Sequence, residues 1–197
     1  MAGLALVGGL LIFLVGAVAW RLAFQAPLAQ ALPAVHAERR RYTWIHTWMV
    51  VAMFVTPAGV AGFAAATGSV LAAMAATVYL VGATCWLVSL TFRLTVLRWA
   101  AGEAVATGSV PGQVAALDSW AGSLYVLHMA AAYAAFAGLG AAVLADGGPA
   151  WLGWLGVGLG LACLGGFVAT RFAGPFNPPF LAHTYTGVLG VWLLTAA

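Results

Sequence analysis

Residues 38–66 read ERRRYTWIHTWMVVAMFVTPAGVAGFAAA, a short charged run followed by a long apolar segment. The apolar part, residues 43–66, contains no charged side chain and exceeds the roughly 20 residues that a helix needs to cross a bilayer. Arginines at one end of such a segment are typical of the cytoplasmic end of a transmembrane helix. These residues therefore predict a membrane-spanning helix that begins at the cytoplasmic face.

The rest of the chain has the same character. Of its 197 residues, 64% are hydrophobic and 6% are charged, whereas a soluble domain has about a quarter of its residues charged. Six apolar segments are long enough to cross the bilayer: residues 3–24, 43–66, 69–92, 116–144, 150–171 and 179–197. The sequence predicts an all-α polytopic membrane protein in which residues 1–197 form one integral membrane domain, a bundle of six transmembrane helices.

The orientation of the bundle follows from its basic residues, all of which are arginines. In a six-helix arrangement they fall on one side of the membrane: Arg21, Arg39, Arg40, Arg41, Arg93, Arg98 and Arg171. The connections on the other side, near Gly68 and at residues 145–149, contain no arginine. The positive-inside rule then predicts an N-out/C-out topology. The short loops and the use of arginine without lysine are typical of a multi-pass protein of a prokaryotic cytoplasmic (inner) membrane.

Several functional classes lack the residues that they require. The two cysteines, Cys85 and Cys163, stand alone in separate apolar segments, which excludes a thiol–disulfide relay. The absence of lysine excludes a retinal Schiff base. A net charge of +3 arises from arginines that flank the membrane, so the expected partners are membrane lipids and other membrane subunits, and nucleic acid is not among them.

Histidines are the ionisable side chains that remain inside the predicted spans. Such residues are costly in lipid and indicate function by default. The helical rise places His46 and His183 about 7 and 6 Å inside the cytoplasmic boundary, and His128 about 15 Å inside it. We therefore expect His46 and His183 to face each other at one depth.

A pair of histidines at equal depth is what a b-type haem requires for two axial ligands. The first functional hypothesis is a histidine-liganded b-type haem protein, or subunit, that transfers electrons within the membrane. His46 and His183 would be the metal ligands and His128 would lie deeper in the same site. The propionates would meet the cytoplasmic arginines Arg39, Arg40 and Arg41.

Other interpretations of the histidines stay open. Each imidazole can simply form a hydrogen bond with a neighbouring helix or a lipid headgroup. A zinc or non-haem iron site made by all three histidines is disfavoured by a difference in depth of about 8 Å. It is disfavoured also because no carboxylate is present to orient the ligands.

The second functional hypothesis is a non-enzymatic protein that binds or transports a small molecule or lipid, or an accessory subunit of a membrane complex. Residues 172–180, FAGPFNPPF, contain three prolines and three phenylalanines. Because such a loop is stiff and apolar, we expect it to fold back onto the bundle. Its neighbours would form a recognition cluster at the cytoplasmic mouth: Arg171, Asn177, His183 and Tyr185. Asp118 and Ser119 are expected to cap the following helix, residues 116–144. No catalytic residues are identified, so the question of enzymatic activity stays open.

Overall fold

The computed structural model describes residues 1–18 and 26–196. Arg21 and the end of the first predicted span lie outside these residues. The described residues form helices joined by loops, with no strand among them. The α-helices are α1 (Ala2–Ala17), α2 (Leu28–Ala37), α3 (Arg39–Thr67), α4 (Val70–Phe92), α5 (Arg98–Thr107), α6 (Val114–Ala145), α7 (Ala150–Ala169) and α8 (Thr184–Thr195). A π-helical segment, η1 (Arg93–Leu97), joins α4 to α5, and two 3₁₀ segments, η2 (Gly174–Phe176) and η3 (Pro179–His183), precede α8.

Four helices are long and apolar enough to cross a membrane: α3, the continuous helix Val70–Thr107, α6 and α7. Helix α1 is equally apolar but has only 16 residues. These lengths and compositions support a multi-pass helical membrane protein.

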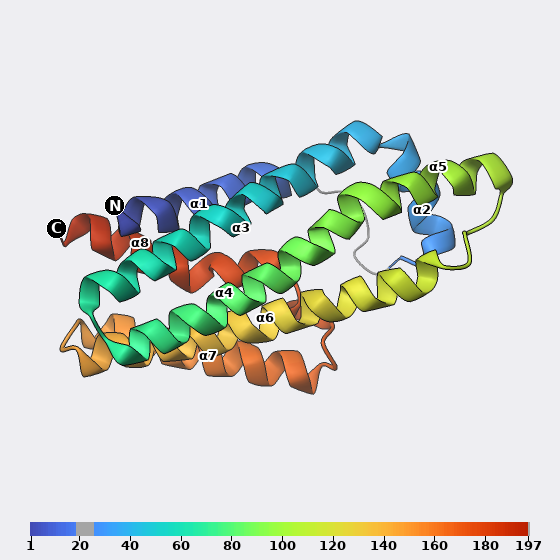
Figure 1. Cartoon of the computed structure of the whole chain (residues 1–197). Coiled ribbons are helices and arrows are strands. Elements are labelled where there is room, and N and C mark those ends of the chain that lie inside the picture. Colours follow the sequence, from blue (N-terminus) through green and yellow to red (C-terminus); the bar gives the residue numbers. More distant parts are fainter. Residues whose placement is uncertain (19–25, 197) are drawn as a thin grey trace.

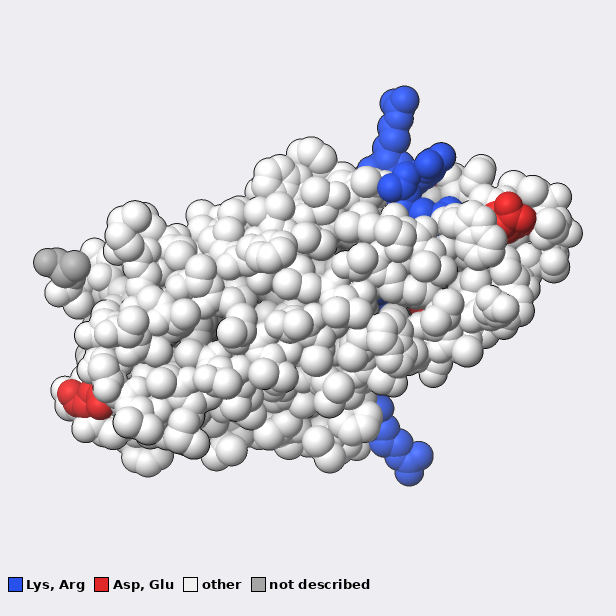
Figure 2. Space-filling model, in the orientation of Figure 1, with Lys and Arg blue, Asp and Glu red and all other residues white. Residues whose placement is uncertain are grey.

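The long helices run side by side, with α1 against α3 and α8, and α6 between α4 and α7 (Figure 1). Both termini lie at the end of the bundle that carries the α3–α4 and α6–α7 turns, whereas α2 and α5 lie at the opposite end. The arginines visible in Figure 2 gather on the half of the molecule that carries α2 and α5. We call this end the arginine end.

Glycines allow the helices to approach closely. A Cβ atom on Gly160 of α7 would lie 2.5 Å from the backbone nitrogen of Ala137 on α6. A Cβ atom on Gly9 of α1 would lie 2.1 Å from Oγ1 of Thr56 on α3. Helix backbones can approach this closely only where the residues between them are small, as in other membrane helix pairs.

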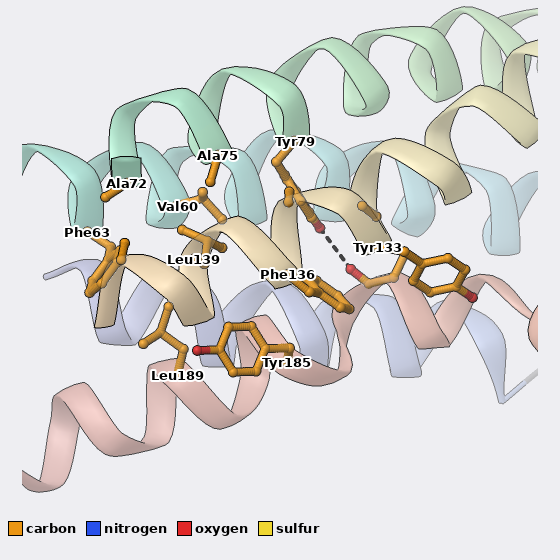
Figure 3. Packing of buried hydrophobic residues seen from close by; sticks show 14 of the residues in the cluster. Val60, Phe63, Ala72, Ala75, Tyr79, Tyr133, Phe136, Leu139, Tyr185 and Leu189 are labelled. Atoms are coloured by element: carbon orange, nitrogen blue, oxygen red, sulfur yellow. Dashed lines mark hydrogen bonds between the residues drawn. The ribbon is translucent and has the colours of Figure 1, made fainter. Parts of the chain in front are cut away.

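The main core lies between these helices and is rich in aromatic rings from α3, α4, α6 and α8 (Figure 3). Its phenol groups find backbone acceptors. The hydroxyl of Tyr79 donates to the carbonyl of Ala182 at 3.1 Å, and that of Tyr185 donates to the carbonyl of Leu152 at 3.3 Å. Buried tyrosines normally have such partners, since an unpaired hydroxyl in an apolar core is costly.

The loop of residues 172–180 folds back onto the bundle, as its sequence predicts. The hydroxyl of Tyr133 donates to the carbonyl of Phe176 at 2.6 Å, and that of Tyr125 donates to the carbonyl of Asn177. The ring of Phe176 packs directly on Gly166, since a Cβ atom on Gly166 would lie 2.4 Å from Cε2 of Phe176. Pro179 is buried, so the chain is already inside the bundle where η3 begins.

The arginine end has a core of its own, in which α2 packs against α5. Val114 is buried in this core and is the first residue of α6. Asp118 and Ser119 therefore lie inside the helix, and the expectation that they cap it is wrong. The helix begins earlier because Val114 gains apolar contacts there, which a start at the polar pair would forgo.

Candidate functional site

A cavity of about 710 Å³ lies at the arginine end, between α2, α3, α4, α6 and residues 171–179. Its volume is within the range of small-molecule sites, roughly 300–1,000 Å³. One part of the wall is apolar and includes Leu28, Met49, Trp86 and Leu97. The polar part contains Tyr42, His46, Arg93, Asp118, Ser119, Ser123, Tyr125, Arg171 and Asn177. The wall is thus amphipathic.

Helix α6 contributes one continuous face to this cavity. Ser119, Gly122, Ser123 and Val126 all line it. Their spacing of three and four residues places them on the same side of a helix. This spacing is present in the sequence and is the signal that could have identified the wall.

The π-helical segment η1 shapes the opposite wall. Its first and last residues, Arg93 and Leu97, both line the cavity. π-Helical turns are rare, and they occur frequently at functional sites. Arg93 lies close enough to Tyr42 and His46 to act on both electrostatically. This wall therefore presents a positive charge beside the imidazole.

The charged groups of the cavity have no ionic partner within the part of the chain that the structure describes. Among the described residues, Glu38 and Arg41 form an ion pair, and this pair lies outside the cavity. Arg93, Arg171 and Asp118 line the cavity and take part in no such pair. An arginine that lines an amphipathic cavity and forms no ion pair with a protein carboxylate is a ready partner for an acidic group of a ligand.

The backbone at the mouth of the cavity is strained. Arg171 and Phe172 have φ angles of 52° and 64°, a left-handed conformation that costs a non-glycine residue roughly 1–2 kcal/mol. Hydrogen bonds at the end of α7 hold this conformation, including one from the amide of Phe172 to the carbonyl of Phe167 at 2.8 Å. Both side chains line the cavity, so the strained turn delivers them to the mouth.

The predicted site residues divide into two groups. His46, Asn177 and Arg171 line the cavity. The remaining predicted residues lie elsewhere. Arg39, Arg40 and Arg41 surround a shallow surface depression with Glu38. Tyr185 is buried and donates to the carbonyl of Leu152, near the start of α7 at the far end of the bundle. Its predicted place in the cytoplasmic cluster is corrected accordingly.

His46 is oriented by its own helix. Its Nδ1–H donates to the carbonyl of Tyr42 at 2.8 Å, because a carbonyl oxygen can only accept. Its ring also packs on the ring of Tyr42, with centroids 4.0 Å apart. These contacts fix the direction of the imidazole at the cavity wall.

His183 lies much deeper than its distance from Pro179 in the sequence implied. Its Nδ1 is 3.3 Å from Oγ1 of Thr56. Thr56 follows His46 by ten residues on α3, which corresponds to about 15 Å along the helix axis. The expectation of equal depth for His46 and His183 is therefore wrong, because the loop enters the bundle before η3 begins. Two axial bonds to one iron from this pair do not fit the structure.

His183 lies near His128 instead. A Cβ atom on Gly82 of α4 would lie 3.3 Å from the carbonyl oxygen of His128, and Tyr79, one turn earlier on α4, donates to the carbonyl of Ala182, the residue before His183. Both histidines therefore lie beside the same turn of α4. The ring of Trp86 stacks on His128 with centroids 4.6 Å apart, and that of Phe13 stacks on His183 at 4.7 Å. In the described part of the chain, no group of three or more His, Cys, Asp or Glu side chains is arranged to hold a metal ion. A site for zinc or iron built from all three histidines is thus not formed.

Comparison of the chain with models of known protein families, with curated proteins and with solved structures gave no match. The functional argument consequently depends on the cavity and on the buried histidines.

Proposed function

We propose that the chain crosses a prokaryotic cytoplasmic membrane six times, with the arginine end in the cytoplasm and both termini outside. In addition to the four long helices, α1 and the segment η3–α8 would cross. Two observations support this count. Helix α1 packs along α3 and α8 packs along α1, and both termini lie at the end of the bundle with the α3–α4 and α6–α7 turns.

Cysteine labelling tests the orientation in a variant whose Cys85 and Cys163 are replaced by alanine. Asp146 and Ser109 lie in exposed loops at opposite ends of the bundle. A membrane-impermeant maleimide should label Asp146→Cys in intact cells and Ser109→Cys only after permeabilisation. The reverse pattern would overturn the orientation, and labelling of both in intact cells would overturn the span count.

For function, we propose that the cavity binds a small amphipathic molecule with an acidic group, taken from the cytoplasmic side or the inner leaflet. The observation that supports this most is the pairing of an apolar wall with Arg93 and Arg171, neither of which has an ionic partner among the described residues. The acidic group would bind the guanidinium groups, and the apolar body would pack on Trp86 and Leu97. Asp118 and the serines of α6 would contact a cationic or hydroxyl group of a zwitterionic ligand.

The proposal makes Arg93 a binding residue and Arg39 a matched control. Arg39 is exposed and does not line the cavity. A fluorescent fatty acid serves as the probe, titrated into purified protein in detergent. Loss of a hydrogen bond to a charged group costs about 1.5–3 kcal/mol, which is roughly a 10- to 100-fold loss of affinity. Arg93→Gln should show this loss and Arg39→Gln should bind as the unsubstituted protein does. Equal affinities for the two variants, or no saturable binding at all, would contradict the proposal.

Haem binding is a second candidate for the same cavity, with His46 as a single axial ligand. It is favoured by the hydrogen bond from His46 Nδ1–H to the carbonyl of Tyr42, since metal-ligating histidines usually donate their other ring N–H in this way. Arg93 and Arg171 would hold the propionates, in place of the predicted Arg39, Arg40 and Arg41. Haem would supply one-electron redox chemistry when bound. A reduced-minus-oxidised b-type absorption band that is lost in His46→Ala would support this candidate, and a colourless folded protein would reject it.

A further inference from the structure

The floor of the cavity separates it from a second, deeper group of polar atoms. Trp86 lines the cavity and also stacks on His128. His128 and His183 are both fully buried, with 0% of their surface exposed. Nε2 of His183 has no hydrogen-bond partner among the described residues, and the backbone of Gly82 is the polar neighbour of the His128 ring, which leaves one of its nitrogens without a partner there. The other nitrogen of His183, Nδ1, is 3.3 Å from the hydroxyl of Thr56.

Buried polar atoms without partners are rare in native proteins, and each indicates a missing partner. Here such atoms occur on two rings that lie beside the same turn of α4, one on each ring. A neutral imidazole offers one nitrogen lone pair, which is the usual way in which histidine binds a metal ion. We propose that His128 and His183 form a binding site for a soft monovalent metal ion, Cu(I), held between one nitrogen of each ring.

The charge of the surroundings decides between metal ions. The four acidic residues of the chain lie at the ends of the bundle or in exposed positions, and none is buried beside the histidines. Two neutral ligands leave the full charge of the ion in an apolar interior. Because the Born cost rises with the square of the charge, a monovalent ion has about a quarter of the desolvation cost of a divalent one. Cu(I) also accepts two ligands in a line, whereas zinc sites need three or four ligands.

One face of α3 extends from the cavity to this site and carries two methionine side chains. Met49 lines the cavity, Met53 packs in the cluster that contains Phe13 and Trp86, and Thr56 contacts His183. The spacing of four and three residues places all three on one side of the helix. Thioether sulfur is a ligand that selects Cu(I). Phe13 stacks on His183, and Trp86, which also lines the cavity, stacks on His128.

The test is an anaerobic titration of the purified full-length protein with Cu(I) in competition with a chromophoric Cu(I) chelator. We expect one Cu(I) per chain and at least a 100-fold loss of affinity in His128→Gln and in His183→Gln. His36→Gln is the control, because His36 is exposed on α2 and should not matter. Arg93→Gln should also leave the Cu(I) affinity unchanged, so failure of the cavity proposal and failure of this one can be distinguished.

Several outcomes would overturn the proposal. These are the absence of stoichiometric Cu(I) binding, equal losses in His36→Gln and His128→Gln, or stoichiometric binding of Zn²⁺ in preference to Cu(I). Where the histidine variants do not fold, X-ray absorption of the unsubstituted protein loaded with Cu(I) decides. A ligand shell with two imidazole nitrogens supports the site, and a shell of sulfur alone, from methionine or cysteine, refutes it.

Discussion

Two adjacent glycines of α1 allow the packing around His183 to be tested with a matched pair of variants. A Cβ atom on Gly9 would lie 2.1 Å from Oγ1 of Thr56 and 3.1 Å from the Cβ and backbone nitrogen of the same residue. A Cβ atom on Gly8 would meet nothing within 4 Å. Gly9→Ala and Gly8→Ala therefore add the same methyl group to the same helix, and they differ only in the atoms that this methyl group contacts.

The expected difference in stability follows from three contributions. Replacing glycine by alanine inside a helix favours folding by about 1 kcal/mol in both variants. In Gly9→Ala the methyl group displaces the Thr56 hydroxyl, and overpacking of this kind costs about 1–3 kcal/mol. The displaced hydroxyl also leaves Nδ1 of His183 without its partner, which costs about 1–3 kcal/mol more. Gly9→Ala should therefore be less stable than Gly8→Ala by about 2–6 kcal/mol.

Thermal unfolding in detergent, followed by circular dichroism, measures this difference. For a chain of this size 1 kcal/mol corresponds to about 2–4 °C, so the midpoint of Gly9→Ala should lie at least about 4 °C below that of Gly8→Ala. Adding Thr56→Ala removes the atom that clashes and should restore part of the loss. Equal midpoints for the two glycine variants, or no recovery in the double variant, would show that α1 does not meet α3 at Thr56 as described.

Three further variants test other parts of the structure. Gly156→Ala should lower the unfolding midpoint relative to Gly158→Ala, because its Cβ would lie 2.4 Å from the ring of Tyr185 whereas that of Gly158 meets nothing within 4 Å; similar midpoints would argue against the contact. Tyr133→Phe removes the 2.6 Å hydrogen bond to residue 176 and should cost about 0.5–1.5 kcal/mol, measured as faster proteolysis within residues 172–180; an unchanged rate would mean that the bond does not hold the loop. Arg171→Gly relieves the left-handed backbone at φ 52°, so its midpoint should stay the same or rise while its affinity for the fluorescent fatty acid falls; unchanged affinity would remove this residue from the site.

The helical segments were predictable because uninterrupted apolar length is a strong signal in lipid. The segment 43–66 lies within α3, and the segment 150–171 nearly coincides with α7. A glycine at position 108 also indicates where α5 ends, because the helix ends at a residue with a left-handed φ of 71°. The composition could not predict how deep inside the bundle a given residue lies. The prediction for His183 took Pro179 as the membrane boundary, but Pro179 is itself buried inside the bundle, and hydrogen bonds from Tyr125 and Tyr133 to loop carbonyls hold the preceding residues there.

The candidate site was predicted in part, for a related reason. Asn177, Arg171 and His46 were predictable because polar residues are scarce in this chain, so each one is a candidate for function. Arg93 was assigned only to orientation, since nothing in its sequence neighbours shows that a π-helical segment would direct it into a cavity. The run Arg39 to Arg41 looked more suitable for binding acidic groups, yet a run of three successive residues points in different directions around a helix. A cavity forms between several helices and loops, so the sequence of one segment does not show which of its residues will line the cavity.

The two proposed sites differ because water reaches only one of them. At the cavity, solvent or an amphipathic ligand can satisfy Arg93 and Asp118, so charged side chains are tolerated there. Behind Trp86 there is no exposed surface at His128 or His183, and a fully charged side chain would be too costly, which leaves histidine as a polar group that can stay neutral at physiological pH. Two neutral, incompletely paired imidazoles at that depth add little to stability, because apolar residues of similar size would pack there without unpaired atoms. Their presence is therefore better explained by a ligand that uses their lone pairs than by packing alone.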